Sequence, residues 1–415
     1  MSELRTLWIP TFIAALAVLV LLVDVLIPRA QDGRARLQKA TGWLVVVGML
    51  GAFAATFFVD ASGRAAFGAY EGGAWATFVQ RIVLAAGALG ALGAVDDVAA
   101  RTPRRQGEYW LLMLSSLLGM VLVPGARDLV LVVVAFELMG IPLYVLAAYA
   151  KTDAEARPGQ DPRKSLAAEA ALKLYLVGAA STAVTLFGLA LLTGATGTSR
   201  LEALAAAPST PLGTLGMLFV LGGIGYKIGM VPFHMWIPDT YQGASVPFVA
   251  FLSVAPKAAG VSVLATIFLS GLGTQRAVWL APVSIAALMS MGVGNLLALL
   301  CFLLSLAGIP FVVGFWAKLY VFLAAWRAGL AWLVASGIVL AVMSLFYYLR
   351  VLRAAYMVDD GADRPAPAPA PALRLAIGLC LVAVVGLGLW PRPLVDSAAR
   401  AGADLLDRTA AVAGR

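Results

Sequence analysis

Long apolar stretches separated by short polar segments run through the whole chain. Windows of about 20 apolar residues, enough to cross a bilayer as a helix, fall near 7–28, 42–59, 76–95, 109–125, 128–149, 167–193, 213–236, 245–271, 277–300, 302–325, 331–356 and 373–391. The first stretch is too long for the core of a signal peptide, so we interpret it as a retained span. The pattern predicts an all-α, polytopic membrane bundle of about 12 transmembrane helices.

One apolar stretch is too long for this pattern. Residues 277–317 contain no charged side chain, and as a helix they would extend about 60 Å, twice the ~30 Å of the hydrocarbon core. The chain must therefore turn near "GVGNLLALLCFLLSLAGIP" (292–310), although no polar loop occurs there.

The composition supports a membrane protein and excludes several other classes. Hydrophobic residues make up 61% of the chain and charged residues 13%, against about 25% charged in soluble domains. The net charge of +8 is spread over loops rather than clustered, which argues against nucleic-acid binding. Basic residues are denser after the first, third and fifth predicted spans, which places the N-terminus outside the cytoplasm. The two cysteines are too few for an iron–sulfur cluster, and neither a metal site nor a cofactor-binding motif is predicted.

Five of the ionisable residues in the predicted spans are weighed as functional candidates, whereas Asp24 and Arg81 lie nearer span ends and are interpreted as anchors. A charge at this depth costs roughly 3 kcal/mol on insertion scales, so each is a candidate functional group. Two have ordinary structural explanations: Lys173 follows Glu169 by one helical turn and can pair with it, and Lys318 can extend to the interface if it lies near a span end. The candidates are Glu137, Lys173, Lys227, Lys257 and Lys318.

The segment "GYKIGMVPFHMWIPD" (225–239) combines a lysine with the single histidine of the chain. His234 follows Lys227 by seven residues, which places both on one helical stripe about 10 Å apart. Pro232 between them predicts a break in the helix, and such breaks persist in membranes only where protein or water satisfies the freed carbonyls. A second interrupted span, "SLAGIPFVVGFWAK" (305–318), carries Lys318. Two such spans are typical of inverted-repeat transporters, so we predict proton or small-cation transport through a lysine relay.

The region 225–264 closely resembles the N-type antiporter-like membrane subunits of NADH-quinone oxidoreductase (respiratory complex I), which are related to Mrp-type cation/proton antiporters. "PFHMWIPDTYQGAS" carries the N-type likeness. Other matching segments are "FELMGIPLYVLAAYAK" (136–151), "SLAAEAALKLYLVGA" (165–179), "MSMGVGNLLAL" (289–299) and "SLAGIPFVVGFWAKLYVF" (305–322). The resemblance covers nearly the whole chain and implies a subunit that couples quinone reduction to proton transfer.

The resemblance also implies roles for individual residues. Glu137 would pair with Lys227 on the broken seventh helix, and Lys257 would be the central relay lysine on the eighth. His234 would belong to the hydrated path between the two lysines. Lys318 would be the lysine of the second broken helix, and Lys173 matches a further lysine of the family.

The chain departs from the family after "GNLLAL", where it continues directly into "LCFLLSLAGIP". Roughly eighty residues, two helices of the second repeat, would be missing near 299–302, and Phe311 replaces the second proline of the usual GIPP. We therefore predict an N-terminal three-helix segment (1–104), a first antiporter-like repeat (105–275), a truncated second repeat (276–358), and a Pro/Ala linker with a C-terminal helix (359–415).

The resemblance implies that the cofactors lie elsewhere in an assembly. NAD, FMN, iron–sulfur clusters and quinone would be bound by other subunits. The expected partners are the other membrane-arm subunits, including M-type and small membrane subunits, and the lipid of a bacterial inner membrane. Two alternatives stay open: a subunit of an Mrp-type cation/proton antiporter, and a non-conducting structural subunit of the complex.

Overall fold

The computed structural model describes residues 2–26, 34–101, 106–149, 162–294, 313–357 and 371–413. Most of the segment 292–310, where a turn is predicted, and the Pro/Ala linker up to residue 370 lie outside these residues. The chain divides into two compact units, which are described separately. Unit 1 comprises Met1–Gly229, Phe233–Trp279 and Ala398–Arg415, and unit 2 comprises Met230–Pro232 and Leu280–Ser397.

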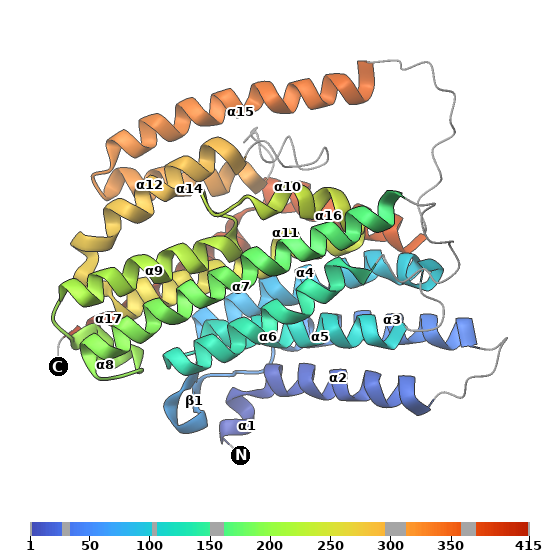
Figure 1. Cartoon of the computed structure of the whole chain (residues 1–415), viewed down its shortest axis with the longest axis horizontal. Helices are drawn as coiled ribbons and strands as arrows, with labels where there is room; N and C mark the ends of the chain where they lie inside the picture. The colour runs from blue at the N-terminus through green and yellow to red at the C-terminus, as the bar shows by residue number, and fades with distance from the viewer. Residues whose placement is uncertain are drawn as a thin grey trace. The chain divides into compact units, whose positions relative to one another are not determined.

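Unit 1 is a bundle of long helices that lie side by side (Figure 1). Helix α7 packs along α9, α5 along α6, α3 along α4, α4 along α11, and α2 along α5. Its helices are α1 (Ser2–Thr6), α2 (Trp8–Leu26), α3 (Arg34–Ala55), α4 (Ala74–Arg101), α5 (Gln106–Leu122), α6 (Leu129–Ala147), α7 (Pro162–Thr196), α8 (Leu201–Ala206), α9 (Pro211–Ile228), α10 (Trp236–Gly243) and α11 (Val246–Ala265).

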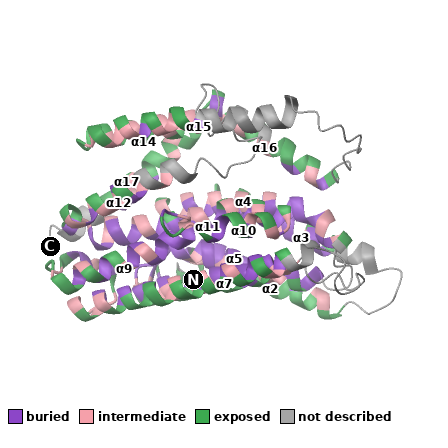
Figure 2. Ribbon diagram, turned by 45° about the horizontal axis from the view of Figure 1, so that its top comes forward, coloured by how far each residue is buried: buried purple, intermediate pink, exposed green. Residues whose placement is uncertain are grey.

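The helices combine a buried face with an apolar outer face, as membrane helices do. On α2 the buried residues include Ile9, Ile13 and Leu16, whereas Leu19 and Leu22 are exposed. In Figure 2 the buried residues gather among α4, α5 and α11, while α2 and α7 carry many exposed ones. Within the described residues, eight helices are long and apolar enough to cross a membrane, and two more apolar helices are shorter. The all-α membrane bundle is confirmed; the predicted number of twelve spans is not.

The predicted break in the seventh span is present. Helix α9 ends at Ile228, and Gly229 caps it with φ +78°, in the left-handed region that glycine adopts readily. A Cβ at Gly229 would also lie 2.4 Å from Cδ1 of Ile237, so only glycine fits here. The helical path resumes with α10 at Trp236, on the far side of Pro232.

The described part of the chain contains elements that the sequence-based prediction lacks. The loop between α3 and α4 contains a short antiparallel hairpin of β1 (Gly63–Ala65) and β2 (Tyr70–Gly72). The chain also forms a helix α17 (Arg392–Ala413) after the last predicted span. The carboxylate of Asp404 in α17 accepts a hydrogen bond of 3.1 Å from the backbone N–H of Trp75 at the start of α4. The last helix therefore supplies an acceptor for an N–H group that the first turn of α4 leaves unpaired.

Unit 2 contains most of α12 (Arg276–Gly294), together with α14 (Val313–Arg327), α15 (Ala331–Met357) and α16 (Pro371–Leu389). Helix α14 packs against α15 and α16. The indole N–H of Trp316 donates a 2.7 Å hydrogen bond to the carbonyl of Gly388 and so joins α14 to α16. No residue of α14 is buried in the described chain, so this helix is loosely covered.

Candidate functional site

Lys227 lies in the last turn of α9 and is 6% exposed. Its Nζ donates a 3.2 Å hydrogen bond to the phenolic oxygen of Tyr144. It also lies 5.2 Å from the ring centroids of Phe136 and Tyr144, and 5.9 Å from that of Tyr226, distances at which an ammonium group is attracted to an aromatic face. A Cβ at Gly140 would lie 2.2 Å from this Nζ. Helix α6 thus leaves room for the charged group.

Glu137 lies one turn before Gly140 on the same side of α6. Its Oε1 accepts a 2.8 Å hydrogen bond from the hydroxyl of Thr182 in α7. The direct pairing of Glu137 with Lys227, expected from the resemblance, does not form in the described part of the chain, because each group takes a hydroxyl as its partner.

Lys257 lies in α11 beside the end of α9. Its Cε would be 3.9 Å from a Cβ at Gly229, the residue that caps α9, and its Nζ lies 5.5 Å from the ring centroid of Tyr241 in α10. Gly260, one turn further along α11, lies against Lys227 and Ile228. The break between α9 and α10 therefore lies next to the buried Lys227 and the partly buried Lys257.

Three polar atoms near this break are buried without a hydrogen-bond partner in the described part of the chain: Nδ1 of His234, Oγ1 of Thr240 and the hydroxyl oxygen of Tyr241. A buried polar atom left unpaired costs about 1–3 kcal/mol, and internal water is the usual partner for such atoms. One of these atoms, the hydroxyl oxygen of Tyr241, belongs to the side chain whose ring lies near Lys257.

Lys173 makes the predicted pair with Glu169, with Nζ 2.6 Å from Oε1. It also binds Asp239 of α10, with Nζ 2.8 Å from Oδ2. All three side chains are about half exposed. Lys173 therefore joins α7 to the helix that follows the break, a contact that the sequence did not predict.

Lys318 lies in α14 of unit 2 and is partly exposed. The Gly/Pro interruption expected before it lies mostly at 305–312, outside the described residues. Four of the predicted site residues therefore lie in one region of unit 1: Glu137, Lys227, His234 and Lys257. Lys173 lies at a more exposed position of the same unit. Lys318 belongs to unit 2.

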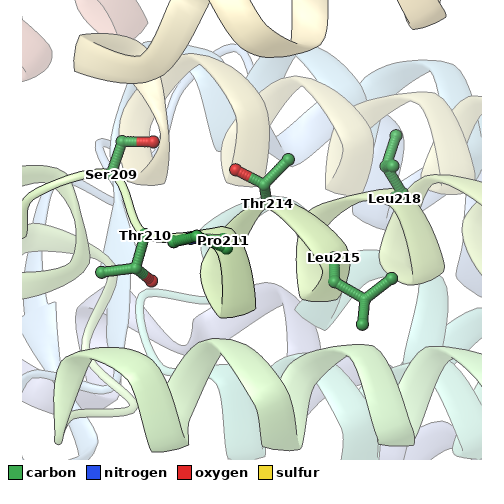
Figure 3. A pocket seen from close by; sticks show the side chains of 6 residues that line it. All are labelled: Ser209, Thr210, Pro211, Thr214, Leu215 and Leu218. Atoms are coloured by element: carbon green, nitrogen blue, oxygen red, sulfur yellow. The ribbon is translucent and has the colours of Figure 1, made fainter.

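Two hollows lie near the helices of the site, an open groove and a small cavity. An open groove of about 480 Å³ lies at the start of α9, at the opposite end of that helix from Lys227 (Figure 3). It has no titratable side chain and is lined by Ser209, Thr210, Pro211, Thr214, Leu215 and Leu218. A much smaller cavity of about 10 Å³ lies beside Glu137 and Thr182, near the size that one water needs. Among the described residues, no cluster of three or more His, Cys, Asp or Glu side chains is placed to hold a metal.

The chain matches the family described as NADH:quinone oxidoreductase/Mrp antiporter, TM, over residues 126–302 and 295–344. It is also 30% identical to NADH-quinone oxidoreductase subunit N of Heliobacterium modesticaldum, over 89% of this chain and 93% of that protein. The chain belongs to this family. This antiporter-like protein is therefore a multi-pass membrane protein.

Solved structures support the same family and fold. A chain of respiratory complex I from Thermus thermophilus superposes with a TM-score of 0.70 and 25% identity, over 92% of this chain and 97% of that one. A chain of the Mrp complex from Dietzia sp. DQ12-45-1b gives 0.71 at 19% identity, over 99% of both, which shows a shared fold.

Two features of the comparisons bear on the length of this antiporter-like chain. The two segments that match the family overlap at residues 295–302. The alignment with the Heliobacterium protein occupies 453 positions and includes 89% of this chain, about 369 of its 415 residues, so roughly 84 positions lie opposite a gap.

Several site residues were not predicted from the sequence. Tyr144 and Thr182 bind Lys227 and Glu137, and Asp239 and Tyr241 contact Lys173 and Lys257. A helical-spacing signal exists for Tyr144, which follows Glu137 by seven residues and so shares its face of α6. Thr182 carries no such signal, because it lies on another helix whose rotation the sequence does not give.

Proposed function

We propose that this chain is a proton-translocating membrane-arm subunit of a bacterial inner-membrane NADH-quinone oxidoreductase. The observation that carries the proposal is the group of ionisable side chains on α6, α9 and α11 and at the break between α9 and α10. Lys227 is buried, and Glu137, His234 and Lys257 are partly buried. Polar atoms that are buried without a partner in the described part of the chain lie close to the break. Charges held inside a membrane bundle at such cost are typical of proton relays.

The relay works by electrostatic coupling. The carboxylate of Glu137 favours the ammonium form of Lys227, and a change that weakens this attraction releases a proton toward His234 and Lys257. The break between α9 and α10 is the element with two arrangements that such a change would bias. Two further lysines complete the proposed relay. Lys173 lies at a more exposed position of unit 1, and Lys318 lies in the truncated second repeat.

The redox chemistry belongs to other subunits in this proposal. NAD, FMN, iron–sulfur clusters and quinone would be bound there, and this chain would contact the neighbouring M-type and small membrane subunits. This assignment is supported by the similarity to an NADH-quinone oxidoreductase subunit N and to a chain of respiratory complex I. The similarity to the Mrp chain supports only a common fold.

The test uses Glu137→Gln and Lys227→Ala in the assembled complex. NADH oxidation and proton pumping are measured in inverted membrane vesicles, after the amount of assembled complex has been matched. Each variant should lower proton pumping at least about tenfold, because a positioned acid or base typically contributes 10²–10⁴-fold to a proton-transfer step. Normal pumping by both variants would refute the relay and support a non-conducting structural role. Pumping that requires sodium ions would support the Mrp-type alternative.

A further inference from the structure

The indole of Trp236 lies at the start of α10 and contacts the residue that precedes Lys227. Its N–H donates a 3.1 Å hydrogen bond to the backbone carbonyl of Tyr226 in the last turn of α9. The ring centroids of Trp236 and Tyr226 lie 5.3 Å apart, within the range of favourable aromatic contacts. Both residues are buried. Trp236 therefore joins the two helices across the break, at a point next to Lys227.

The break explains why this hydrogen bond forms. Because α9 ends at Ile228, the carbonyls of its last turn lose their usual helical partners. In a membrane bundle such carbonyls need a partner from protein or water. The carbonyl of Tyr226 accepts from the backbone N–H of Gly229 at 3.0 Å and from the indole of Trp236. The helix after the break thus supplies a donor to the end of the helix before it.

The side chain of Tyr226 is held from α7 as well. Its hydroxyl donates a 2.7 Å hydrogen bond to the backbone carbonyl of Leu174, and its ring centroid lies 5.9 Å from Nζ of Lys227. Trp236 therefore packs against a ring that is fixed at its far end and that borders the buried ammonium group. A displacement of Trp236 would change the surroundings of Lys227.

Trp236 also faces the second lysine through Tyr241. The ring centroids of Trp236 and Tyr241 lie 6.4 Å apart, and the Tyr241 centroid lies 5.5 Å from Nζ of Lys257. An ammonium group is attracted to an aromatic face at such distances. The rings of Tyr226, Trp236 and Tyr241 thus form an aromatic row that borders Lys227 at one end and Lys257 at the other, with Trp236 in the middle.

Helix α10 depends on contacts of this kind for its position. It has only eight residues, and isolated helices shorter than about 12 residues are marginal in water. Its N-cap residue, Met235, makes no side-chain capping hydrogen bond. The 2.8 Å contact of Asp239 with Lys173 is about half exposed, and exposed ion pairs contribute little. Of these two contacts, we expect the buried one at Trp236 to hold α10 more firmly.

We propose that Trp236 is a positioning residue for the lysine relay. Its indole fixes α10 against the end of α9, and the aromatic row then sets where Lys227 and Lys257 lie relative to each other. The inference rests on the proposed function and adds the side chain that holds the break in place. Trp236 itself transfers no proton, because an indole N–H is a donor only.

The test uses two measurements on the assembled complex. Hydrogen–deuterium exchange of the backbone at 226–237 reports opening of the break, whether or not the chain pumps protons. The number of protons pumped per NADH oxidised, measured in inverted vesicles, reports the relay. A purely structural defect lowers the amount of complex, and with it NADH oxidation and pumping together, so the ratio of protons to NADH does not change.

The variants separate the indole N–H from the shape of the ring. Trp236→Phe removes the N–H and part of the ring, whereas replacing Trp236 by benzothienylalanine puts sulfur in place of the N–H and keeps the shape. Trp279→Phe is the matched control. The buried Trp279 likewise donates its indole N–H to a backbone carbonyl, that of Leu272, at 2.9 Å, and packs 5.7 Å from the ring of Phe268. These contacts lie beyond the C-terminal end of α11, away from the break.

Both changes at Trp236 should raise the exchange rate of 226–237 about twofold to tenfold, because a lost buried hydrogen bond of typical strength favours local opening by that factor. The number of protons pumped per NADH should fall, though less than in Lys227→Ala, since both lysines remain present. Trp279→Phe should leave the exchange of 226–237 and the ratio of protons to NADH unchanged.

Other results would overturn the inference. Unchanged exchange in both Trp236 variants would show that the indole does not hold the break. Faster exchange with a normal ratio of protons to NADH would show that the contact is structural only. An equal fall of this ratio in Trp279→Phe would remove the specific role of Trp236. If Trp236→Phe does not assemble, the benzothienylalanine variant supplies both measurements.

Failure of the proposed function has a different signature. If Glu137→Gln and Lys227→Ala pump normally, the proposed function is wrong, whereas the exchange measurement still decides whether Trp236 holds the break. If those two variants lose pumping while both Trp236 variants keep the normal ratio of protons to NADH, the relay stands and the positioning role of Trp236 is overturned.

Discussion

The lysines of α9 and α14 lie in different surroundings, although each lies in an apolar helix near a predicted interruption. Lys227 in α9 is enclosed by three aromatic rings, a phenolic hydroxyl and the glycine face of α6. Lys318 in α14 is partly exposed, on a helix with no buried residue in the described chain. An enclosed charge depends on specific partners, whereas a partly exposed one can exchange protons with water.

The truncation of the second repeat, which the sequence analysis predicts, would explain this difference. The family match divides at 295–302, shortly before α14 begins at Val313. Two helices of the second repeat would be absent there, and helices that are absent cannot bury a neighbour. The first repeat, by contrast, keeps α6, α7, α9 and α11 around its lysines. The comparison predicts that proton transfer is more sensitive to change in the first repeat than in the second.

The largest expected contrast is between Lys257→Ala and Lys318→Ala. The first should lower proton pumping about tenfold or more, because its partly buried site offers few substitutes for the lost base. The second should lower it by about twofold, because water reaches a half-exposed position more easily. Both losses are measured as the proton-pumping rate of vesicles that contain matched amounts of complex. Equal losses would show that the second repeat conducts through a site as restrictive as the first.

A smaller contrast is expected from glycine substitutions in the two units. Gly140→Ala places a Cβ 2.2 Å from Lys227 Nζ and should destabilise the chain by about 1–3 kcal/mol through overpacking, with reduced pumping. Gly378→Ala in α16 meets nothing within 4 Å and should be neutral or stabilising by up to about 1 kcal/mol, because alanine favours helix more than glycine. Thermal unfolding of the purified complex measures the difference. A harmless Gly140→Ala would mean that the ammonium group is not confined as described.

The smallest effect is expected from Asp239→Asn. This change removes one of the two carboxylates on Lys173, and exposed ion pairs contribute only about 0–1 kcal/mol. Glu169→Gln removes the other carboxylate but keeps the contact between α7 and α10, so it is the matched control. Pumping should fall by less than about twofold in Asp239→Asn and remain unchanged in Glu169→Gln. A loss as large as that of Glu137→Gln would instead place Asp239 within the relay.

The features that the sequence predicted well are those set by chemistry along one helix. Pro232 after a glycine-rich span predicts a break, and α9 does end at Ile228. Lys173 lies one turn after Glu169, and the two side chains do pair. Hydropathy likewise predicts the membrane spans, since the cost of burying backbone and charge in lipid is large.

The features that the sequence did not predict depend on how helices rotate against one another. The spacing of Glu137 and Lys227 does not reveal that their hydrogen-bond partners are the hydroxyls of Thr182 and Tyr144 respectively. Helix α17 was missed for another reason: its charged residues give it low mean hydropathy, so it lacks the signal of a span. The hairpin of β1 and β2 was missed because each strand has only three residues.

The contact between α17 and α4 has a consequence for biogenesis. Trp75 and Asp404 are 329 positions apart, so the ribosome releases the acceptor for the start of α4 long after that helix has entered the translocon. A fusion partner or a deletion in α17 would therefore disturb the start of α4 as well as the C-terminal helix. Tags for purification are better placed at the other terminus.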